Sequence, residues 1–419
     1  MGKVIADLHI HSRYSRACSK QISIANLEKY ARLKGLGLLG TGDFQHPEWQ
    51  KELKQELVED GTGIPKTKTG FPFAYSTEVS LMYTDVKGRR IHLVALAPSI
   101  EVVDQITDAL GKRGRLDYDG RPIFKIPCPE FVEMMRNISK DIEVIPAHIW
   151  TPWFGLFGSM SGFDSMIEAF KDQSKHIHAI ETGLSSDPAM NWRMSQLENR
   201  QILSFSDSHS FWPWRIGREA TIFDLKKLTY SDLIKAIRTG EGLKETIEFF
   251  PEEGKYHYDG HRNCKVCMDP KESRKHNKIC PVCKKPMTIG VMHRVEELAD
   301  KPKGYKPKTA KPYKSLIPVS ELIAHGVGAG IATQKTWKVY NALINEFGND
   351  MNIALEADEE KIKKIAPEKV ADLILRNRFQ KIKFQPGYDG EYGRPIFDES
   401  KKKEIKPVKP AQKGLSEFC

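Results

Sequence analysis

The chain has 419 residues, of which 40% are hydrophobic and 29% are charged, so it is long enough for one large domain with smaller units attached. No apolar run approaches the roughly 20 residues that a membrane-spanning helix needs, and the amino terminus shows no signal-peptide core. We therefore expect a soluble cytoplasmic protein that acts as a monomer and has no membrane partner. Four of the seven cysteines lie close together, which indicates a metal site rather than a disulfide framework.

Residues 1–250 alternate short apolar runs with helix-like stretches, which predicts an α/β fold with a barrel or a sheet. Polar side chains lie at or just after the ends of these runs, where the active-site face of a parallel barrel would be. They are His9, His11, Asp43, Glu78, His148, Asp207 and His209. His92 lies early in its own run.

Histidine and carboxylate side chains in this arrangement are typical of a metal centre. His9 and His11 are two residues apart, as are Asp207 and His209, so each pair can offer both side chains to one cavity. Imidazole and carboxylate together suit zinc, manganese or iron, and one carboxylate can bridge two ions. A single histidine in such a run is more often a structural residue, and the prediction depends on the whole set.

The four clustered cysteines form two Cys-x-x-Cys pairs, Cys264 with Cys267 and Cys280 with Cys283, separated by 12 residues. This spacing predicts a closed tetrahedral zinc site in a small domain at residues 251–300. Residues 262–314 contain 15 Lys and Arg against 5 Asp and Glu, an excess equal to the net charge of +10 of the whole chain. A polyanionic partner such as nucleic acid explains this excess, whereas a zinc that only pins a solvated linker is the alternative.

The remaining segments differ in composition. Residues 301–318 are rich in Lys and Pro and predict an extended linker, residues 319–397 predict a helical DNA-binding domain, and residues 398–419 predict a flexible tail. Within the helical domain, the HGVGAG sequence at residues 325–330 resembles a helix-hairpin-helix DNA contact, although an ordinary helix-connecting turn has the same composition.

Aromatic residues are concentrated after two of the metal-ligand positions, and aromatics on such loops can stack on an extruded base. The alternative is packing beneath the loops. The candidates are Trp150, Trp153, Phe154 and Phe157 after His148, and Phe211, Trp212 and Trp214 after His209.

The DLHIHS and SDSH motifs resemble those of the polymerase and histidinol phosphatase (PHP) family of metal-dependent phosphoesterases. This resemblance implies a distorted seven-stranded β/α barrel over residues 1–250 that holds two or three zinc, magnesium or manganese ions. It implies one ion bound by His9, His11, Glu78 and Asp207, a second by Glu78, His92 and His148, and a third by Asp43 and His209. It also implies catalytic roles for His9, His11, Asp43, Glu78, His148 and Asp207. Two positions depart from the family pattern: Asp43 replaces a histidine, and Ala17, next to Cys18, replaces another. The third ion is the one that these departures put in question.

The barrel, the cysteine pairs, the GVMHRVEELAD sequence and the helical unit occur in an order that resembles the endonuclease Q family of DNA-repair enzymes. This resemblance implies cleavage of damaged DNA on the 5′ side of a deaminated base (uracil, hypoxanthine or xanthine) or an abasic site, leaving 3′-hydroxyl and 5′-phosphate ends. The alternatives are a phosphatase acting on small monoesters, a proofreading exonuclease acting in trans, and a DNA-binding scaffold without catalysis.

The tail ends with QKGLSEFC, in which Gln412, Leu415 and Phe418 resemble a peptide that docks on the replicative sliding clamp. A helical turn would bring Leu415 and Phe418 together in one hydrophobic pocket. The Lys- and Pro-rich segment before it would serve as a tether. We therefore expect the sliding clamp as a second partner.

Overall fold

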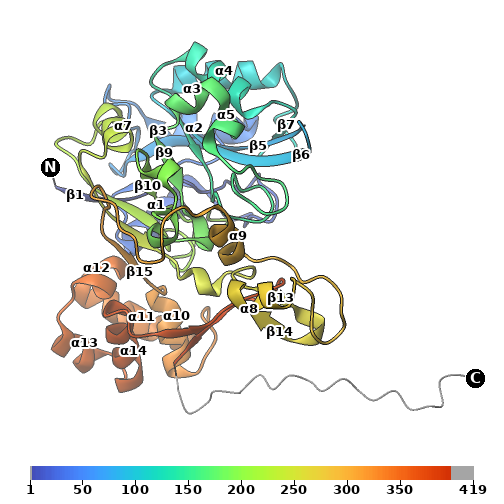
Figure 1. Ribbon diagram of the computed structural model, residues 1–419. Coiled ribbons are helices and arrows are strands. Elements are labelled where there is room, and N and C mark those ends of the chain that lie inside the picture. The colour runs from blue at the N-terminus through green and yellow to red at the C-terminus, as the bar shows by residue number, and fades with distance from the viewer. Residues whose placement is uncertain (1, 398–419) are drawn as a thin grey trace, which may run out of the picture.

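The structure is a computed structural model that describes residues 2–397 (Figure 1). Its largest element is a nine-stranded sheet in the order β15-β12-β11-β1-β2-β5-β6-β8, with β7 paired to β5. The strands are β1 (Lys3–Asp7), β2 (Leu38–Gly40), β5 (Phe73–Thr84), β6 (Gly88–Ala97), β7 (Ile123–Phe124), β8 (Glu143–Pro146), β11 (Ala220–Asp224), β12 (Leu243–Glu248) and β15 (Tyr313–Ser315). No helix among residues 2–397 has both the length and the apolar character needed to cross a membrane.

The sheet is mixed, which corrects the expectation of a parallel barrel. Strand β1 is parallel to β2, and β2 to β5, but β6 is antiparallel to both β5 and β8, and β11 is antiparallel to both β1 and β12. The remaining side is spanned by two parallel strands, β9 (Ala179–Glu181) and β10 (Gln201–Leu203). Isolated backbone hydrogen bonds connect this pair of strands and the residues after it to the main sheet. The Ile149 amide donates to the Glu181 carbonyl at 3.2 Å, and the His11 amide donates to the Ser208 carbonyl at 2.9 Å. The α/β class is confirmed, and the strands form a curled mixed sheet, with β9 and β10 paired separately from it.

Alternate side chains of these strands converge on the inside of the curled sheet, as the two-residue period of a strand requires. Val4, Ala6 and Leu8 of the first strand region join one buried cluster with side chains from β2, β5, β6, β8, β9, β10 and β11. Helix α7 (Tyr230–Thr239) closes this cluster with Leu233 and Ile237. The interior is therefore a packed core.

Helices cover the outside of the sheet. They are α1 (Ile24–Lys34), α2 (Pro47–Glu56), α3 (Ile100–Gly111), α4 (Cys128–Ile138), α5 (Met166–Phe170) and α6 (Pro188–Asn191), with 3₁₀ turns η1 (Lys171–His176), η2 (Gly183–Ser185) and η3 (Ser195–Leu197). Local sequence sets their ends: in α1 the Ser23 side chain accepts from the Asn26 amide, and Gly35 ends the helix in the left-handed conformation at φ 91°. A short hairpin, β3 (Leu57–Val58) with β4 (Lys66–Thr67), follows α2.

A second small unit carries the clustered cysteines. It contains η4 (Pro251–Glu253), the hairpin β13 (Asp259–His261) and β14 (Val266–Met268), η5 (Arg262–Cys264), α8 (Pro270–Lys275) and α9 (Val291–Leu298). The late hairpin β16 (Lys383–Gln385) and β17 (Arg394–Ile396) returns to this unit, since the Tyr258 amide donates to the Gly387 carbonyl at 3.0 Å. Residues 386–393 are thus far from the cysteines in sequence but adjacent to them in space.

The third unit is helical and lies below the sheet in Figure 1, beside the cysteine unit. Its helices are α10 (Val319–Val327), α11 (Gln334–Phe347), α12 (Asp350–Leu355), α13 (Glu359–Ile365) and α14 (Glu368–Arg378). Its core is continuous with that of the first unit, because Leu322 and Leu373 belong to the same buried cluster as Trp49 and Phe131. The Lys- and Pro-rich segment differs from a free linker: its last residues form β15, which pairs in parallel with β12.

Candidate metal centre at the rim of the sheet

The predicted metal-ligand residues meet at the rim of the sheet, but not all of them lie at strand ends as expected. His9, His11, His148 and Asp207 follow the ends of strands, whereas Glu78 and His92 lie within β5 and β6. One group consists of His9, His11, Glu78 and Asp207, whose ligand atoms all lie within 4.8 Å of one another. His11 Nε2 lies 3.0 Å from Asp207 Oδ1 and 3.3 Å from Glu78 Oε2. His9 Nε2 lies 3.6 Å from Glu78 Oε2, is buried, and has no hydrogen-bond partner. An unpartnered buried imidazole nitrogen that faces carboxylates fits a metal-ligand position.

A second group consists of Glu78, His92 and His148. Glu78 Oε1 lies 2.8 Å from His92 Nδ1 and 3.0 Å from His148 Nε2. Glu78 therefore belongs to both groups, with one oxygen directed to each. This is the arrangement expected of a carboxylate that bridges two ions.

Burial and charge together set the protonation of this centre. Burial alone would raise the pKa of the Glu78 carboxyl, but the charges of His92 and Arg121 outweigh it and hold that pKa well below its usual value. Burial lowers the pKa of His92 to about 4. Glu78 and His92 thus present an ionised carboxylate beside a neutral imidazole, which are forms that bind metal ions. At His9, His11 and His148, by contrast, burial is outweighed by the neighbouring carboxylates, which raise the pKa of these imidazoles.

Two carboxylates orient the histidines from behind. Glu181 accepts from His9 Nδ1 at 2.9 Å, and Asp43 accepts from His11 Nδ1 at 2.9 Å. Each ring therefore directs its Nε2 toward the centre, as metal-binding histidines do when a carboxylate holds their other nitrogen. Glu181 was not predicted from the sequence, although it is the last residue of the buried strand β9.

Asp43 and His209, the pair that the family resemblance implies for a third ion, both lie beside His11. Asp43 Oδ2 already accepts from the Ser12 amide at 2.6 Å, the Ser12 hydroxyl at 2.7 Å and the Ser15 hydroxyl at 2.9 Å. His209 Nδ1 donates to the Asp207 carbonyl at 2.9 Å. Neither residue belongs to a potential metal group among residues 2–397. Both carboxylate oxygens of Asp43 therefore already accept hydrogen bonds, and one of these bonds orients the His11 ring.

The backbone is strained at three residues of this centre. Asp43, His148 and Asp207 have positive φ angles of 45°, 31° and 47°. Non-glycine residues adopt this region at a cost and are concentrated at functional sites, where the surrounding structure holds them in place. The strain is thus a sign of function that does not depend on the identity of the side chains.

Two arginines bring positive charge to the centre, and neither was predicted from the sequence. Arg121 Nη1 lies 3.0 Å from Glu78 Oε2, and the side chain is 26% exposed. Arg215 lines an open hollow of about 500 Å³ together with Asp207, His209 and Cys18. This hollow gives a substrate access to the first metal group.

The aromatic candidates fall into two sets. Trp150, Phe157 and Phe211 are at most 3% exposed, so they are core residues and not a stacking surface for a base. Trp212 and Trp214 stack on each other with centroids 5.0 Å apart, and both contact Trp337 of α11, so they join the first and third units. At these five positions the structure favours the alternative left open by the sequence, which is packing beneath the loops.

Trp153 and Phe154 remain at the edge of the centre. The Phe154 ring lies 4.5 Å from the His92 ring, and Trp153 packs edge-on against Tyr256 at 5.3 Å. Both are half-buried, and Phe154 has a positive φ of 69°. Phe154 therefore lies beside the second metal group, whereas Trp153 packs on Tyr256.

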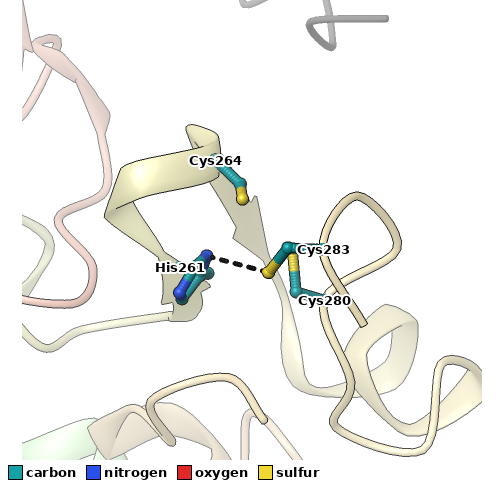
Figure 2. A group of neighbouring side chains, drawn as sticks. All are labelled: His261, Cys264, Cys280 and Cys283. Atoms are coloured by element: carbon teal, nitrogen blue, oxygen red, sulfur yellow. Dashed lines mark hydrogen bonds between the residues drawn. The ribbon is translucent and has the colours of Figure 1, made fainter. Parts of the chain in front are cut away.

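The cysteine unit brings together a different set of ligands from the predicted one. His261, Cys264, Cys280 and Cys283 form a potential metal group, and Figure 2 shows their side chains pointing toward one another. Cys267 is outside this group because it lies on β14, opposite Gly260. The predicted clamp-binding residues Gln412, Leu415 and Phe418 lie outside the described residues.

Two solved structures are similar to this chain over almost its whole length. The lesion-specific endonuclease PfuEndoQ of Pyrococcus furiosus shares 32% identity and a TM-score of 0.85, over 95% of this chain and 96% of that one. The second is an endonuclease Q in complex with a 27-mer duplex that carries an abasic lesion at the active site. It shares 31% identity and a TM-score of 0.84, and the match covers 97% of this chain and 100% of that one.

Sequence relatives give a consistent picture. Residues 318–381 match the family model of the MJ0043 C-terminal domain. The uncharacterised protein MJ0043 of Methanocaldococcus jannaschii is 34% identical over 257 residues, which are 60% of this chain and 32% of that protein, so the match spans about a third of the relative. The uncharacterised protein YqxK of Bacillus subtilis is 28% identical over 94% of this chain and 99% of its own length.

Proposed function

This chain belongs to the endonuclease Q family, and from that premise we propose that it is a metal-dependent endonuclease that cuts damaged DNA. The bond cut is the phosphodiester on the 5′ side of uracil, hypoxanthine, xanthine or an abasic site, and the products carry 3′-hydroxyl and 5′-phosphate ends. The observation that carries the proposal is the pair of metal groups that share Glu78. Divalent ions in these groups, zinc, magnesium or manganese, would activate water and neutralise the phosphodiester charge.

The chain's own residues support this chemistry. Glu181 and Asp43 fix the orientation of His9 and His11, so the ligand nitrogens are in place before substrate arrives. The Arg121 guanidinium can donate to a phosphate oxygen at the same centre, because it is partly exposed and already lies 3.0 Å from Glu78.

Two alternatives are weaker on structural grounds. A phosphatase for small monoesters has no use for a basic unit beside the sheet, whereas residues 262–314 carry 15 basic side chains against 5 acidic ones. A scaffold without catalysis has no reason to keep strained backbone at His148 and Asp207 or an orphaned imidazole nitrogen on His9.

The proposed activity is tested with end-labelled duplexes that contain one uracil, one hypoxanthine, one xanthine, one abasic site or no lesion, each with magnesium, manganese or zinc. We expect a single cut 5′ of each lesion and no cut in the undamaged duplex. Extension by a polymerase checks the 3′-hydroxyl, and ligation checks the 5′-phosphate. Cleavage of all five duplexes at the same rate would contradict lesion recognition.

Trp153→Ala should lower cutting at a base lesion more than binding to the undamaged duplex, because a stacked base contributes about 1–3 kcal/mol.

Arg121→Ala is expected to lower the cleavage rate about 10²-fold, the usual cost of removing one preorganised donor from a transition state. Metal content should stay at the wild-type level, because Arg121 is a cation and not a ligand. Arg121→Lys should recover part of the rate. Arg115→Ala is the matched control, because Arg115 is exposed and pairs only with Asp117 in the same loop. An Arg121→Ala enzyme as fast as wild type would remove Arg121 from the reaction.

We also propose that the tail binds the sliding clamp through Gln412, Leu415 and Phe418, as their spacing predicts. Titration of the clamp with the full chain and with Phe418→Ala tests this. Equal binding by the two proteins, or binding by neither, would show that the tail has no such role.

A further inference from the structure

A partly enclosed hollow lies beneath the Lys- and Pro-rich segment. Its volume is about 260 Å³, and its walls come from residues 188–202, from residues between 238 and 246, and from residues 307–312. It shares no lining residue with the two metal groups of the rim. Gln201, which begins β10, lies in its wall, whereas Asp207 of the rim centre lies beyond the other end of that strand. The hollow is therefore a site apart from the metal centre.

The segment that covers the hollow is held on both sides. The Tyr305 hydroxyl donates to the Glu198 carboxylate at 2.9 Å, and the Thr246 amide donates to the Pro312 carbonyl at 3.2 Å. Pro307 and Pro312 both line the hollow, and proline stiffens the chain because its ring fixes φ. The covering segment is thus an anchored arch, and the hollow beneath it is preformed.

Two cations in the wall have no carboxylate to balance them. Arg200 donates to neutral oxygens, the Gln196 carbonyl at 2.7 Å and the Ser174 hydroxyl at 2.9 Å, and burial lowers the pKa of its guanidinium. The Lys311 side chain makes no hydrogen bond or ion pair with any residue from 2 to 397. Half-buried cations without a counter-charge are costly, so this wall favours an anionic ligand.

The other charges of the wall are already paired. Arg238 Nε lies 2.7 Å from the Glu143 carboxylate, and Glu198 lies 3.8 Å from Lys301 Nζ outside the hollow. Neither pair offsets the charge of Arg200 or Lys311. A phosphate group would supply the missing negative charge, and charge-assisted hydrogen bonds from lysine and arginine are the strong ones.

Trp192 gives the hollow a flat aromatic wall. Its ring packs edge-on against Tyr313 with centroids 5.7 Å apart, and this contact fixes its orientation. An indole face stacks readily on a nucleobase. The Gln201 side-chain amide, in the same wall, has no hydrogen-bond partner within the described part of the chain. An amide both donates and accepts, so it matches the mixed polar edge of a base.

We propose that this hollow binds a nucleoside monophosphate, with the phosphate at Lys311 and Arg200 and the base at Trp192. The volume limits the ligand, because pockets for larger molecules begin at about 300 Å³. A single nucleotide is therefore favoured over a dinucleotide or an oligonucleotide. The proposal adds a ligand site to the proposed nuclease and does not depend on cleavage.

The test is calorimetric titration of the full-length protein with 5′-AMP, with adenosine and with inorganic phosphate. We expect 5′-AMP to bind at least about 10-fold more tightly than either part alone, since the charged contact and the stacked ring both contribute. Lys311→Ala should weaken 5′-AMP binding at least about 10-fold, and Lys311→Arg should restore it. Lys308→Ala is the matched control, because Lys308 is exposed on the same segment but does not line the hollow.

Glu78→Gln separates this site from the rim centre, whose metal ions can also hold a phosphate. That variant should bind 5′-AMP at the hollow as the wild type does. Loss of binding in Glu78→Gln, or equal effects of Lys311→Ala and Lys308→Ala, would overturn the proposal. So would a failure of 5′-AMP to bind, or phosphate binding as tightly as 5′-AMP. Because no cleavage is measured, the nucleotide site and the proposed nuclease activity can fail separately.

Discussion

Glu78→Gln is expected to lower cleavage by at least about 10³-fold, which corresponds to about 4 kcal/mol of transition-state stabilisation. The substitution keeps the size of the side chain and removes the charge that both metal groups share. Glu78 Oε1 contacts His92 and His148, and Oε2 faces His11 and Arg121, so no other carboxylate can replace it. Rates on a lesion duplex, with metal content measured on the same preparation, check the prediction.

The matched control for this experiment is Glu101→Gln, the same chemical change on the exposed side of α3. That variant should cleave and bind metal at wild-type levels. Circular dichroism should show both variants folded, because glutamine fits the volume of glutamate. A Glu78→Gln enzyme within a few-fold of the wild-type rate would show that the rim centre is not where catalysis occurs.

The ligands of the rim centre were predictable because each lies beside a strand whose apolar pattern is visible in the sequence. His9 and His11 follow one such run, and Asp207 follows another, so the topology had only to bring the ends of the runs together. The same signal was present for Glu181, which ends the apolar run at residues 177–181. Arg121 had no such signal, because it comes from an irregular loop between α3 and β7.

The potential metal group of the cysteine unit shows where spacing alone is ambiguous. His261-x-x-Cys264 and Cys264-x-x-Cys267 overlap, and each has the spacing of a metal-binding turn. Only the pairing of His261 with Val266 decides which of these residues face Cys280 and Cys283. The role of the aromatic residues stayed open for a related reason: whether Trp212 meets a base or meets Trp337 depends on a contact between distant segments.

The fold prediction was limited by strand direction. Alternation of strands and helices favours parallel pairing, and it holds for β1, β2 and β5. Strands β5 and β6, however, are joined by three residues, too few for a helical crossover, so they form an antiparallel hairpin. Likewise, Lys and Pro composition predicts an extended chain at residues 301–318 but not that its end pairs with β12.

A buried ion pair joins the first unit to the helical unit, and its loss is expected to be the largest single effect on stability. Lys34 Nζ lies 2.8 Å from Asp350 Oδ1, and the two side chains are only 3% and 1% exposed. Lys34 ends α1, and Asp350 begins α12, so each charge also faces the favourable end of its own helix dipole. The contact therefore fixes two helix ends against each other.

Lys34→Met is expected to destabilise the protein by about 3–5 kcal/mol, because it leaves the Asp350 carboxylate buried without a counter-charge. The double variant Lys34→Met/Asp350→Leu should recover most of the loss, since it removes both charges from the interior. Lys3→Met is the matched control: Lys3 pairs with Glu356 between the same two units at 2.9 Å, but the side chains are 46% and 67% exposed. An exposed pair of this kind contributes at most about 1 kcal/mol. Urea unfolding of the four proteins measures these differences, and a Lys34→Met protein as stable as Lys3→Met would show that the buried pair does not hold the two units together.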